Sequence, residues 1–216
     1  MTGRERILMT LNGGRPDRIP VSLYRVNPFE GETFWTQHAS FRRLLDAARE
    51  KTDAFQFHRP DTGFFFSAPG TIAVKVEESQ DSPISHIVKL TVETDLGLLT
   101  RVARMTRVSS TVWIQKPWIE SEKDIRKFLS LPYTPFDPDV SGLTAVQSAL
   151  GERGMAVVAL PDPLGVVGPL FAPGDFARFA FECPGLVHDL LEAINERLKP
   201  VYERLSRKIG NALVRI

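Results

Sequence analysis

Residues 1–24, MTGRERILMTLNGGRPDRIPVSLY, decide the expected fold, because they predict a helix, a tight turn and a strand in close succession. Ile7 and Leu11 lie on one face of the predicted helix. Thr2, followed three residues later by Glu5, is typical of a capping box at a helix start. The Gly-Gly pair and the proline after it end the helix.

A strand is predicted from Ile19 to Tyr24, where β-branched and aromatic residues predominate. The order RERIL…LNG…PDRIPV resembles the start of the uroporphyrinogen decarboxylase superfamily, which includes the decarboxylase and the cobalamin-dependent methyltransferases. Some of these methyltransferases methylate coenzyme M. The methyltransferase-like branch is also similar to three later segments: ETDLGLLTRV, TVWIQKPWIESEKDIRKFLSLP and DPLGVVGPLFAPGDFARFAFECPGLVHDLLEAINERL.

Strand patterns alternate with helix-length segments along the chain, which predicts parallel β/α construction. The resemblance implies a (β/α)8 TIM barrel in particular. We count barrel strands at 19–24, 53–58, 155–161 and 212–216. A β-rich segment, 71–118, interrupts this rhythm and predicts an inserted antiparallel sheet. The expected fold class is therefore α/β. Residues 1–216 would form one barrel domain, truncated to about its first half and incomplete at the C-terminus.

The bulk composition excludes several classes of protein. The 27 basic and 26 acidic residues nearly cancel, so neither nucleic acid nor an acidic membrane surface is expected as a partner. Cys183 is the single cysteine, which excludes an internal disulfide and favours a reducing compartment. No apolar run is long enough for a membrane span, and no signal peptide is recognisable. These features predict a cytoplasmic protein. A half-barrel would expose apolar faces and strand edges, so we expect a homodimer or aggregation.

The resemblance implies methyl transfer between a corrinoid and a small acceptor such as a thiol, with a small-molecule substrate or a corrinoid protein as partner. Two alternatives remain: decarboxylation in tetrapyrrole biosynthesis, and a non-catalytic truncated binding module. The decarboxylases carry an arginine-rich loop after the first strand, where this chain reads PVSLYRVNPFEGETFW. The methyltransferases hold zinc with a His-x-Cys pair, which this chain lacks. No cofactor is therefore expected in this chain, and zinc and a corrinoid would belong to a C-terminal half.

In such barrels the chemistry lies at the carboxyl ends of the strands. After the second strand, His58 and Asp61 are the candidate catalytic pair for proton transfer, and Arg59 between them could bind an anion. The alternative is an Arg–Asp turn pair beside a hydrogen-bonded histidine. The other candidate substrate-binding residues follow the remaining strands: Tyr24, Arg25, Asp162 and Arg215. Asp162 could equally cap the turn that follows it. No metal site is predicted.

The aromatic segment FFFSAPG, residues 64–70, also allows two interpretations. Its rings could form an apolar wall for a flat ligand such as a corrin, or they could pack in the core beneath the β-rich segment. We favour core packing. His86 has no partner at metal-ligand spacing, and Cys183 is expected to act as a small buried hydrophobic residue.

Overall fold

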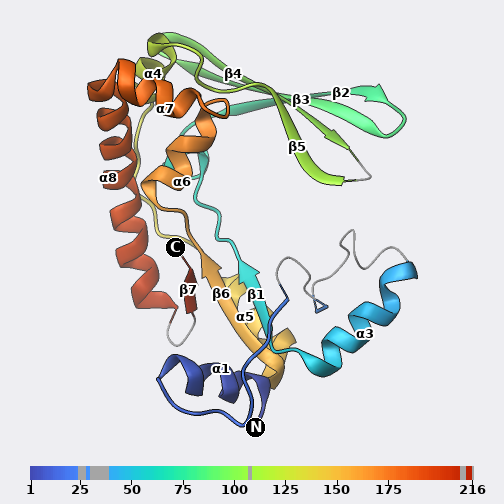
Figure 1. Cartoon of the computed structure of the whole chain (residues 1–216). Coiled ribbons are helices and arrows are strands. Elements are labelled where there is room, and N and C mark those ends of the chain that lie inside the picture. Colours follow the sequence, from blue (N-terminus) through green and yellow to red (C-terminus); the bar gives the residue numbers. More distant parts are fainter. Residues whose placement is uncertain (24–27, 30–38, 107–108, 210–212, 216) are drawn as a thin grey trace. The chain divides into compact units, whose positions relative to one another are not determined.

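The computed structural model describes residues 1–23, 28–29, 39–106, 109–209 and 213–215. The chain forms two compact units. The first unit comprises Met1–Pro60, Asp139–Leu160 and Arg207–Ile216, and the second comprises Asp61–Pro138 and Pro161–Ser206. Figure 1 labels the elements of both.

The first unit begins with helix α1, Gly3–Leu11. The predicted capping box is confirmed, since the Thr2 hydroxyl accepts a hydrogen bond from the Glu5 amide at 3.2 Å. The Thr2 amide donates in return to the Glu5 carboxylate at 2.8 Å. These two bonds satisfy amides that the first helical turn leaves without a partner. Ile7, on the predicted apolar face, is buried.

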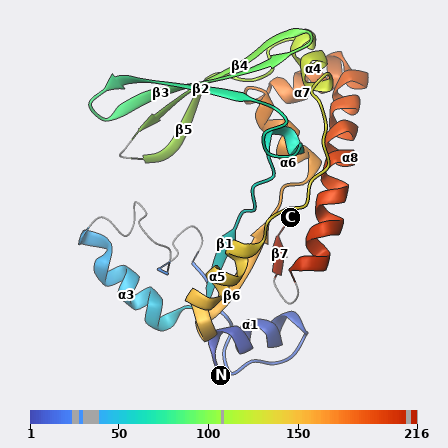
Figure 2. The same cartoon turned by 180° about the vertical axis from the view of Figure 1, so that it is seen from behind.

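A parallel sheet of three strands forms the centre of the first unit, with β6 (Gly154–Ala159) between β1 (Ala54–His58) and β7 (Leu213–Arg215) (Figure 1 and Figure 2). β6 is almost wholly buried, as its apolar sequence GMAVVA predicts. Gly154 pairs with Ala54, and a Cβ there would lie 1.9 Å from the Ala54 carbonyl oxygen. Only glycine therefore allows β1 and β6 to approach this closely.

Helix α5, Ser141–Leu150, packs on β1 and β6, and α1 also contacts β6. Helix α3, Arg42–Lys51, precedes β1 and buries Leu45 and Ala48. Two 3-10 turns complete the described part of this unit, Ala39–Phe41 (η1) and Gly151–Arg153 (η3).

The predicted TIM barrel is wrong. The described residues form a three-stranded parallel sheet without barrel closure and a separate four-stranded antiparallel sheet, so parallel β/α units do not repeat along the chain. The predicted first strand is also absent over 19–23. Val21 makes one bond that resembles strand pairing, from the Asp53 amide to its carbonyl at 2.7 Å, but its own amide donates to the Asp53 side chain. A side chain therefore takes the place of the next ladder bond.

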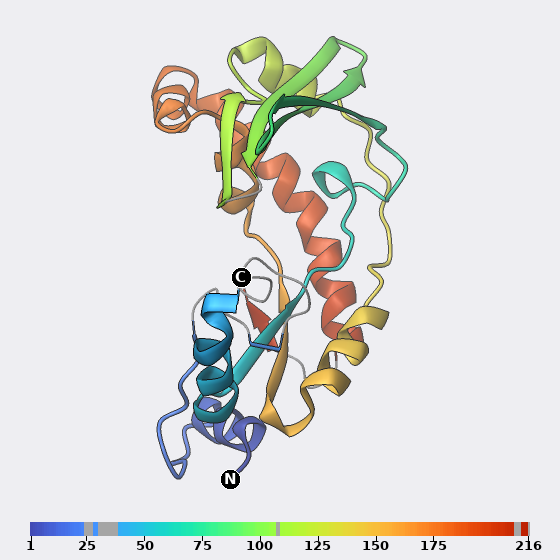
Figure 3. The ribbon, with the colours of Figure 1, turned by 90° about the vertical axis from the view of Figure 1, so that its right-hand side faces the viewer.

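The second unit contains an antiparallel sheet of β2 (Val74–Ser82), β3 (Ser85–Thr94), β4 (Gly97–Thr106) and β5 (Ser109–Lys116), paired in that order. The antiparallel pairing expected within 71–118 is thus present. Gly97 takes a φ of 110° where the Asp95-Leu96 turn re-enters β4. Figure 3 shows the twist of these strands from the side.

Among the described residues, four helices accompany this sheet, and α8 is the longest. Their bounds are Glu122–Leu129 (α4), Pro163–Val167 (α6), Asp175–Glu182 (α7) and Pro184–Lys208 (α8), with 3-10 turns at Phe64–Phe66 (η2) and Gly168–Leu170 (η4). Helix α4 packs against β4. Among the helices described, none has the length and apolar character needed to cross a membrane.

The aromatic segment belongs to the core of the second unit, which is the interpretation we favoured. Phe65 and Phe66 are buried, and the Phe65 ring lies 5.1 Å from that of Phe128. The buried Arg197 of α8 donates to the Phe65 carbonyl at 3.1 Å and to the Leu131 carbonyl at 2.7 Å. Phe65 and Phe66 have positive φ angles, 51° and 54°, and the Arg197 bond stabilises this unfavourable turn.

An ion-pair cluster joins α1, the following turn and the start of β1 in the first unit. Arg6 donates to Asp17 at 2.6 and 2.9 Å and also binds the Asp53 carboxylate. Arg18 contacts both Asp53 oxygens, at 2.8 and 3.0 Å. Asp53 is only 1% exposed, and its carboxylate also accepts the Val21 amide at 3.0 Å. Arg6, Asp17 and Arg18 all come from the RERIL and PDRIPV segments.

We expect Asp53→Ala to destabilise the protein by about 3–5 kcal/mol, because it leaves Arg6 buried without one of its two carboxylates. Urea denaturation measures this change. Asp46→Ala is the matched control, since Asp46 forms an exposed pair with Arg49 on α3 and such pairs contribute about 0–1 kcal/mol. Equal losses for the two variants would contradict a structural role for the cluster.

Stability should also fall in acid through Asp17. The Arg6 guanidinium, as a hydrogen-bond donor, holds the pKa of this carboxyl well below its ordinary value of 3.8. The folded state therefore binds the Asp17 proton less readily than the unfolded state. The resulting stabilisation is complete above pH 3.8 and declines as the pH falls further. Urea midpoints measured from about pH 6 to pH 2 should decline less steeply for Asp17→Asn. An unchanged slope would show that Asp17 does not contribute.

Candidate functional site at the carboxyl edge of the parallel sheet

The parallel register of the first unit brings the ends of its strands together. His58, the last residue of β1, pairs with Val158, while Arg215, the last residue of β7, pairs with the neighbouring Ala159. Arg59 directly follows His58. The carboxyl edge of a parallel sheet is where open α/β proteins bind ligands. Three of the predicted site residues, His58, Arg59 and Arg215, therefore belong to one edge by backbone position.

His58 packs against the start of α5. A Cβ at Gly142 would lie 2.6 Å from the His58 Cε1 atom, so the imidazole occupies the space that a side chain would fill. The Nε2 atom of His58 is buried and has no hydrogen-bond partner among the described residues. A buried polar atom without a partner costs about 1–3 kcal/mol. This nitrogen is therefore the atom at the carboxyl edge that lacks a hydrogen bond, which a ligand group or a water molecule would supply.

Gln56 provides a second buried polar atom without a hydrogen-bond partner. It lies two residues before His58 on β1, and alternate residues of a strand share a face of the sheet. Its Oε1 atom is also buried without a partner in the part of the chain that the structure describes. One face of β1 thus carries an amide oxygen and an imidazole nitrogen that both lack a partner.

Asp139 places negative charge near the imidazole. Its carboxylate accepts hydrogen bonds from the Ser141 amide at 2.8 Å and the Ser141 hydroxyl at 2.9 Å, just before α5. These bonds lower the pKa of the Asp139 carboxyl, and attraction to Lys208 and His58 lowers it further. Asp139 is therefore ionised at neutral pH.

The remaining predicted site residues belong to the second unit or are not described. Asp61 and Asp162 belong to the second unit. Asp61 accepts the Gly63 amide at 2.8 Å, and Asp162 caps α6 by accepting the Gly165 amide at 2.6 Å. The capping interpretation of Asp162 therefore holds, while its role in ligand binding stays a prediction. Tyr24 and Arg25 lie outside the described residues, as does the side chain of Arg215.

The sequence interpretation missed Gln56, Asp139 and Gly142. Gln56 had a usable signal, because the alternation in DAFQFH places it on the same face as His58. Gly142 and Asp139 had none, since only the packing of α5 on β1 brings them to the histidine.

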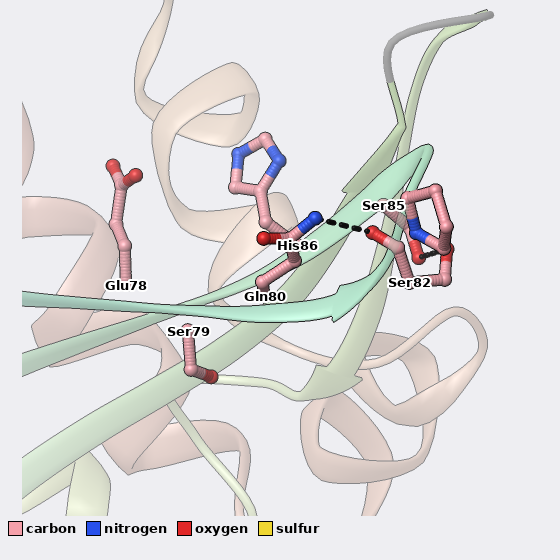
Figure 4. Close-up of a pocket in the computed structure, with 7 residues that line it drawn as sticks. Glu78, Ser79, Gln80, Ser82, Ser85 and His86 are labelled. Carbon is pink, nitrogen blue, oxygen red and sulfur yellow. Dashed lines mark hydrogen bonds between the residues drawn. The ribbon is translucent and has the colours of Figure 1, made fainter.

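A hollow of about 250 Å³ lies on the β2–β3 hairpin of the second unit (Figure 4). Glu78, Gln80 and His86 line it, together with a pair of serine hydroxyls, Ser82 and Ser85, that are 2.7 Å apart. All of its lining residues belong to one hairpin. Small-molecule sites are mostly apolar and enclosed, so this hollow does not have the character of a ligand site.

The described side chains do not fit a zinc–thiolate centre. No three or more His, Cys, Asp and Glu side chains within the described ranges are arranged to hold a metal ion. Cys183 donates its thiol to the Phe179 carbonyl at 3.3 Å, and burial raises its pKa. A raised pKa keeps the thiol protonated and poorly nucleophilic.

Comparison of the chain with protein-family models, with curated proteins and with solved structures gives no match. The first unit can therefore be classed only by its own geometry. It is an α/β unit whose parallel sheet carries a histidine with an unpartnered nitrogen at the carboxyl edge.

We expect Gly142→Ala to displace the His58 ring and to destabilise the protein by about 1–3 kcal/mol through overpacking. NMR of the His58 ring and urea denaturation together measure both effects. Gly185→Ala is the control, because Gly185 is likewise the second residue of its helix but has open space around it. That control should be neutral or slightly stabilising. An unchanged His58 signal in Gly142→Ala would contradict the close contact.

Proposed function

We propose that the chain is a methyltransferase-like relative of the uroporphyrinogen decarboxylase superfamily, and that the carboxyl edge of β1, β6 and β7 holds a small anionic methyl acceptor. The observation that carries this proposal is the buried, unpartnered Nε2 of His58 at that edge. Arg59 and Arg215 occupy neighbouring backbone positions. Arginine positions at the same sheet edge as an imidazole favour an anion that also has a proton to release.

A thiol that carries an acidic group matches this arrangement. In this proposal His58 accepts the thiol proton at Nε2, and Arg59 neutralises the acidic group of the acceptor. The thiolate sulfur then forms a bond to the methyl carbon of a methylcorrinoid substrate. Both electrons of the cobalt–carbon bond stay on cobalt, which passes from Co(III) to Co(I). Asp139 would stabilise the imidazolium that results.

Support for the family assignment comes from the resemblance of the RERIL…LNG…PDRIPV order and of the three later segments. The decarboxylase alternative has no observation among the described residues in its favour. A corrinoid protein remains the expected partner.

The test combines the full chain with methylcobalamin and 2-mercaptoethanesulfonate, a thiol with an acidic group. We expect loss of the methylcobalamin absorption and formation of the methyl thioether, detected by mass spectrometry. His58→Gln should slow the reaction by about 10²–10⁴-fold, and Arg59→Gln should mainly raise KM for the thiol.

His86→Gln is the matched control, because His86 lies on the β2–β3 hairpin of the second unit, and it should react like the unmodified chain. Calorimetric titration with the thiol in the absence of methylcobalamin separates binding from chemistry. Binding without transfer would favour the binding-module alternative, and the absence of both would overturn the proposal.

A further inference from the structure

The Nε2 atom of His58 is buried, so a ligand can reach it only if a neighbouring element moves. Among the described residues, β6 and α5 both adjoin the imidazole (Figure 2). β6 is the central strand of the parallel sheet, and its Val158 pairs with His58 and is wholly buried. At the start of α5, a Cβ on Gly142 would lie 3.6 Å from Nε2. Of these two elements, only the start of α5 can move without breaking the sheet.

The second half of α5 is attached to the sheet through Gln147. The side-chain amide group of Gln147 donates to the carbonyls of Gly151 and Gly154 at 3.2 and 3.3 Å. Its side-chain oxygen accepts a hydrogen bond from the amide of Ala156, on β6, at 2.9 Å. Leu150, the last residue of the helix, is wholly buried. These contacts hold the end of α5 in place.

The start of α5 has much weaker support. Its N-cap residue is Val140, whose aliphatic side chain cannot accept the hydrogen bond that Ser, Thr, Asp or Asn accepts at this position. Gly142 follows as the second helical residue, and only proline is less favourable than glycine within a helix. Asp139 accepts the Ser141 amide, but this bond links neighbouring residues and does not attach them to the sheet. Among residues 141–145, all of them described, only Leu143 is buried.

The closed position of this segment also leaves polar atoms without partners. His58 Nε2 and Gln56 Oε1 are buried without a hydrogen bond on one face of β1, within the described part of the chain. When residues 141–145 move away, water or a ligand can bond to both atoms. The recovered hydrogen bonds offset part of the cost of exposing Leu143, which favours opening of this part of the helix alone.

We propose that residues 141–145 are a gate, which opens and closes over His58 and Gln56 while the second half of α5 stays attached to β6 through Gln147. The open form admits the methyl acceptor to Nε2, which in the closed form no ligand can contact. The identity of the ligand that enters rests on the proposed function, whereas the motion itself does not. The gate accounts for the way in which a buried nitrogen can act as a base.

Amide hydrogen exchange of the full chain, followed by NMR, tests the gate. In an α-helix the Val146 amide bonds to the Gly142 carbonyl, so opening removes its partner. The Leu150 amide bonds to the Val146 carbonyl in the attached half and keeps its partner. After correction for intrinsic exchange rates, we expect Val146 to exchange about tenfold or more faster than Leu150. Equal exchange rates for the two amides would overturn the proposal.

Ala145→Gly and Ala149→Gly are matched variants, because both alanines are exposed residues of α5. Ala145→Gly should raise the exchange rate of the Val146 amide about fivefold, since glycine weakens the helix within the gate. Ala149→Gly should leave that rate unchanged, because position 149 lies in the attached half. Equal acceleration by the two variants would mean that the whole helix opens, which would contradict a gate at its start. Circular dichroism verifies that each variant is folded.

A thiol placed beneath the gate tests whether opening uncovers the site. In a Cys183→Ser background, Gln56→Cys should react with a thiol reagent in the folded state, about fivefold faster when combined with Ala145→Gly. Ala149→Gly should not change that rate. A thiol that reacts only when urea unfolds the whole chain would refute the gate. Neither readout uses a methyl donor or acceptor, so opening without any methyl transfer would support the gate and overturn only the proposed function.

Discussion

The first unit depends on one buried carboxylate. Asp53 precedes β1 and accepts hydrogen bonds from Arg6, Arg18 and the Val21 amide. These contacts attach helix α1 and the Pro-Asp-Arg turn to the start of the parallel sheet. A charge this deeply buried is tolerated only when all of its partners are in place. Removal of any one partner would leave the others buried without compensation, which makes the arrangement sensitive to each single loss.

The position of His58 follows from this arrangement in a few steps. Asp53 anchors the start of β1. Gly154 has no side chain, which allows the backbones of β1 and β6 to approach closely. The paired register then carries His58 to the carboxyl edge beside Val158. Helix α5 packs on the same strands and closes over the imidazole at Gly142, which has no side chain to displace it. The buried Nε2 is thus a consequence of backbone packing and not of the local sequence.

Local features were predictable from the sequence, and long-range features were not. The Thr2–Glu5 capping box, the apolar strand β6 and the antiparallel pairing within 71–118 depend on neighbours a few residues away or on simple alternation. The barrel expectation came from the resemblance and failed, since the described strands form a small parallel sheet and a separate antiparallel sheet, and the strand expected at 19–24 is absent over 19–23. Val21 instead gives its amide to a side chain, and alternation cannot reveal that competition. At the site, His58 could be placed by its strand end, but Gly142 and Asp139 could not, since helix packing brings them there.

A resemblance in sequence can indicate a local fold or a reaction, and the contacts of the N-terminal residues distinguish the two. Within the N-terminal segments that carry the resemblance, the charges of Arg6, Asp17 and Arg18 face one another and Asp53. Ion pairs that satisfy each other have little remaining capacity to bind a substrate. The segment therefore explains a local fold and does not identify a reaction. Chemistry must come from groups that the fold leaves unsatisfied, and in the described part of the first unit these are His58 Nε2 and Gln56 Oε1 on one face of β1.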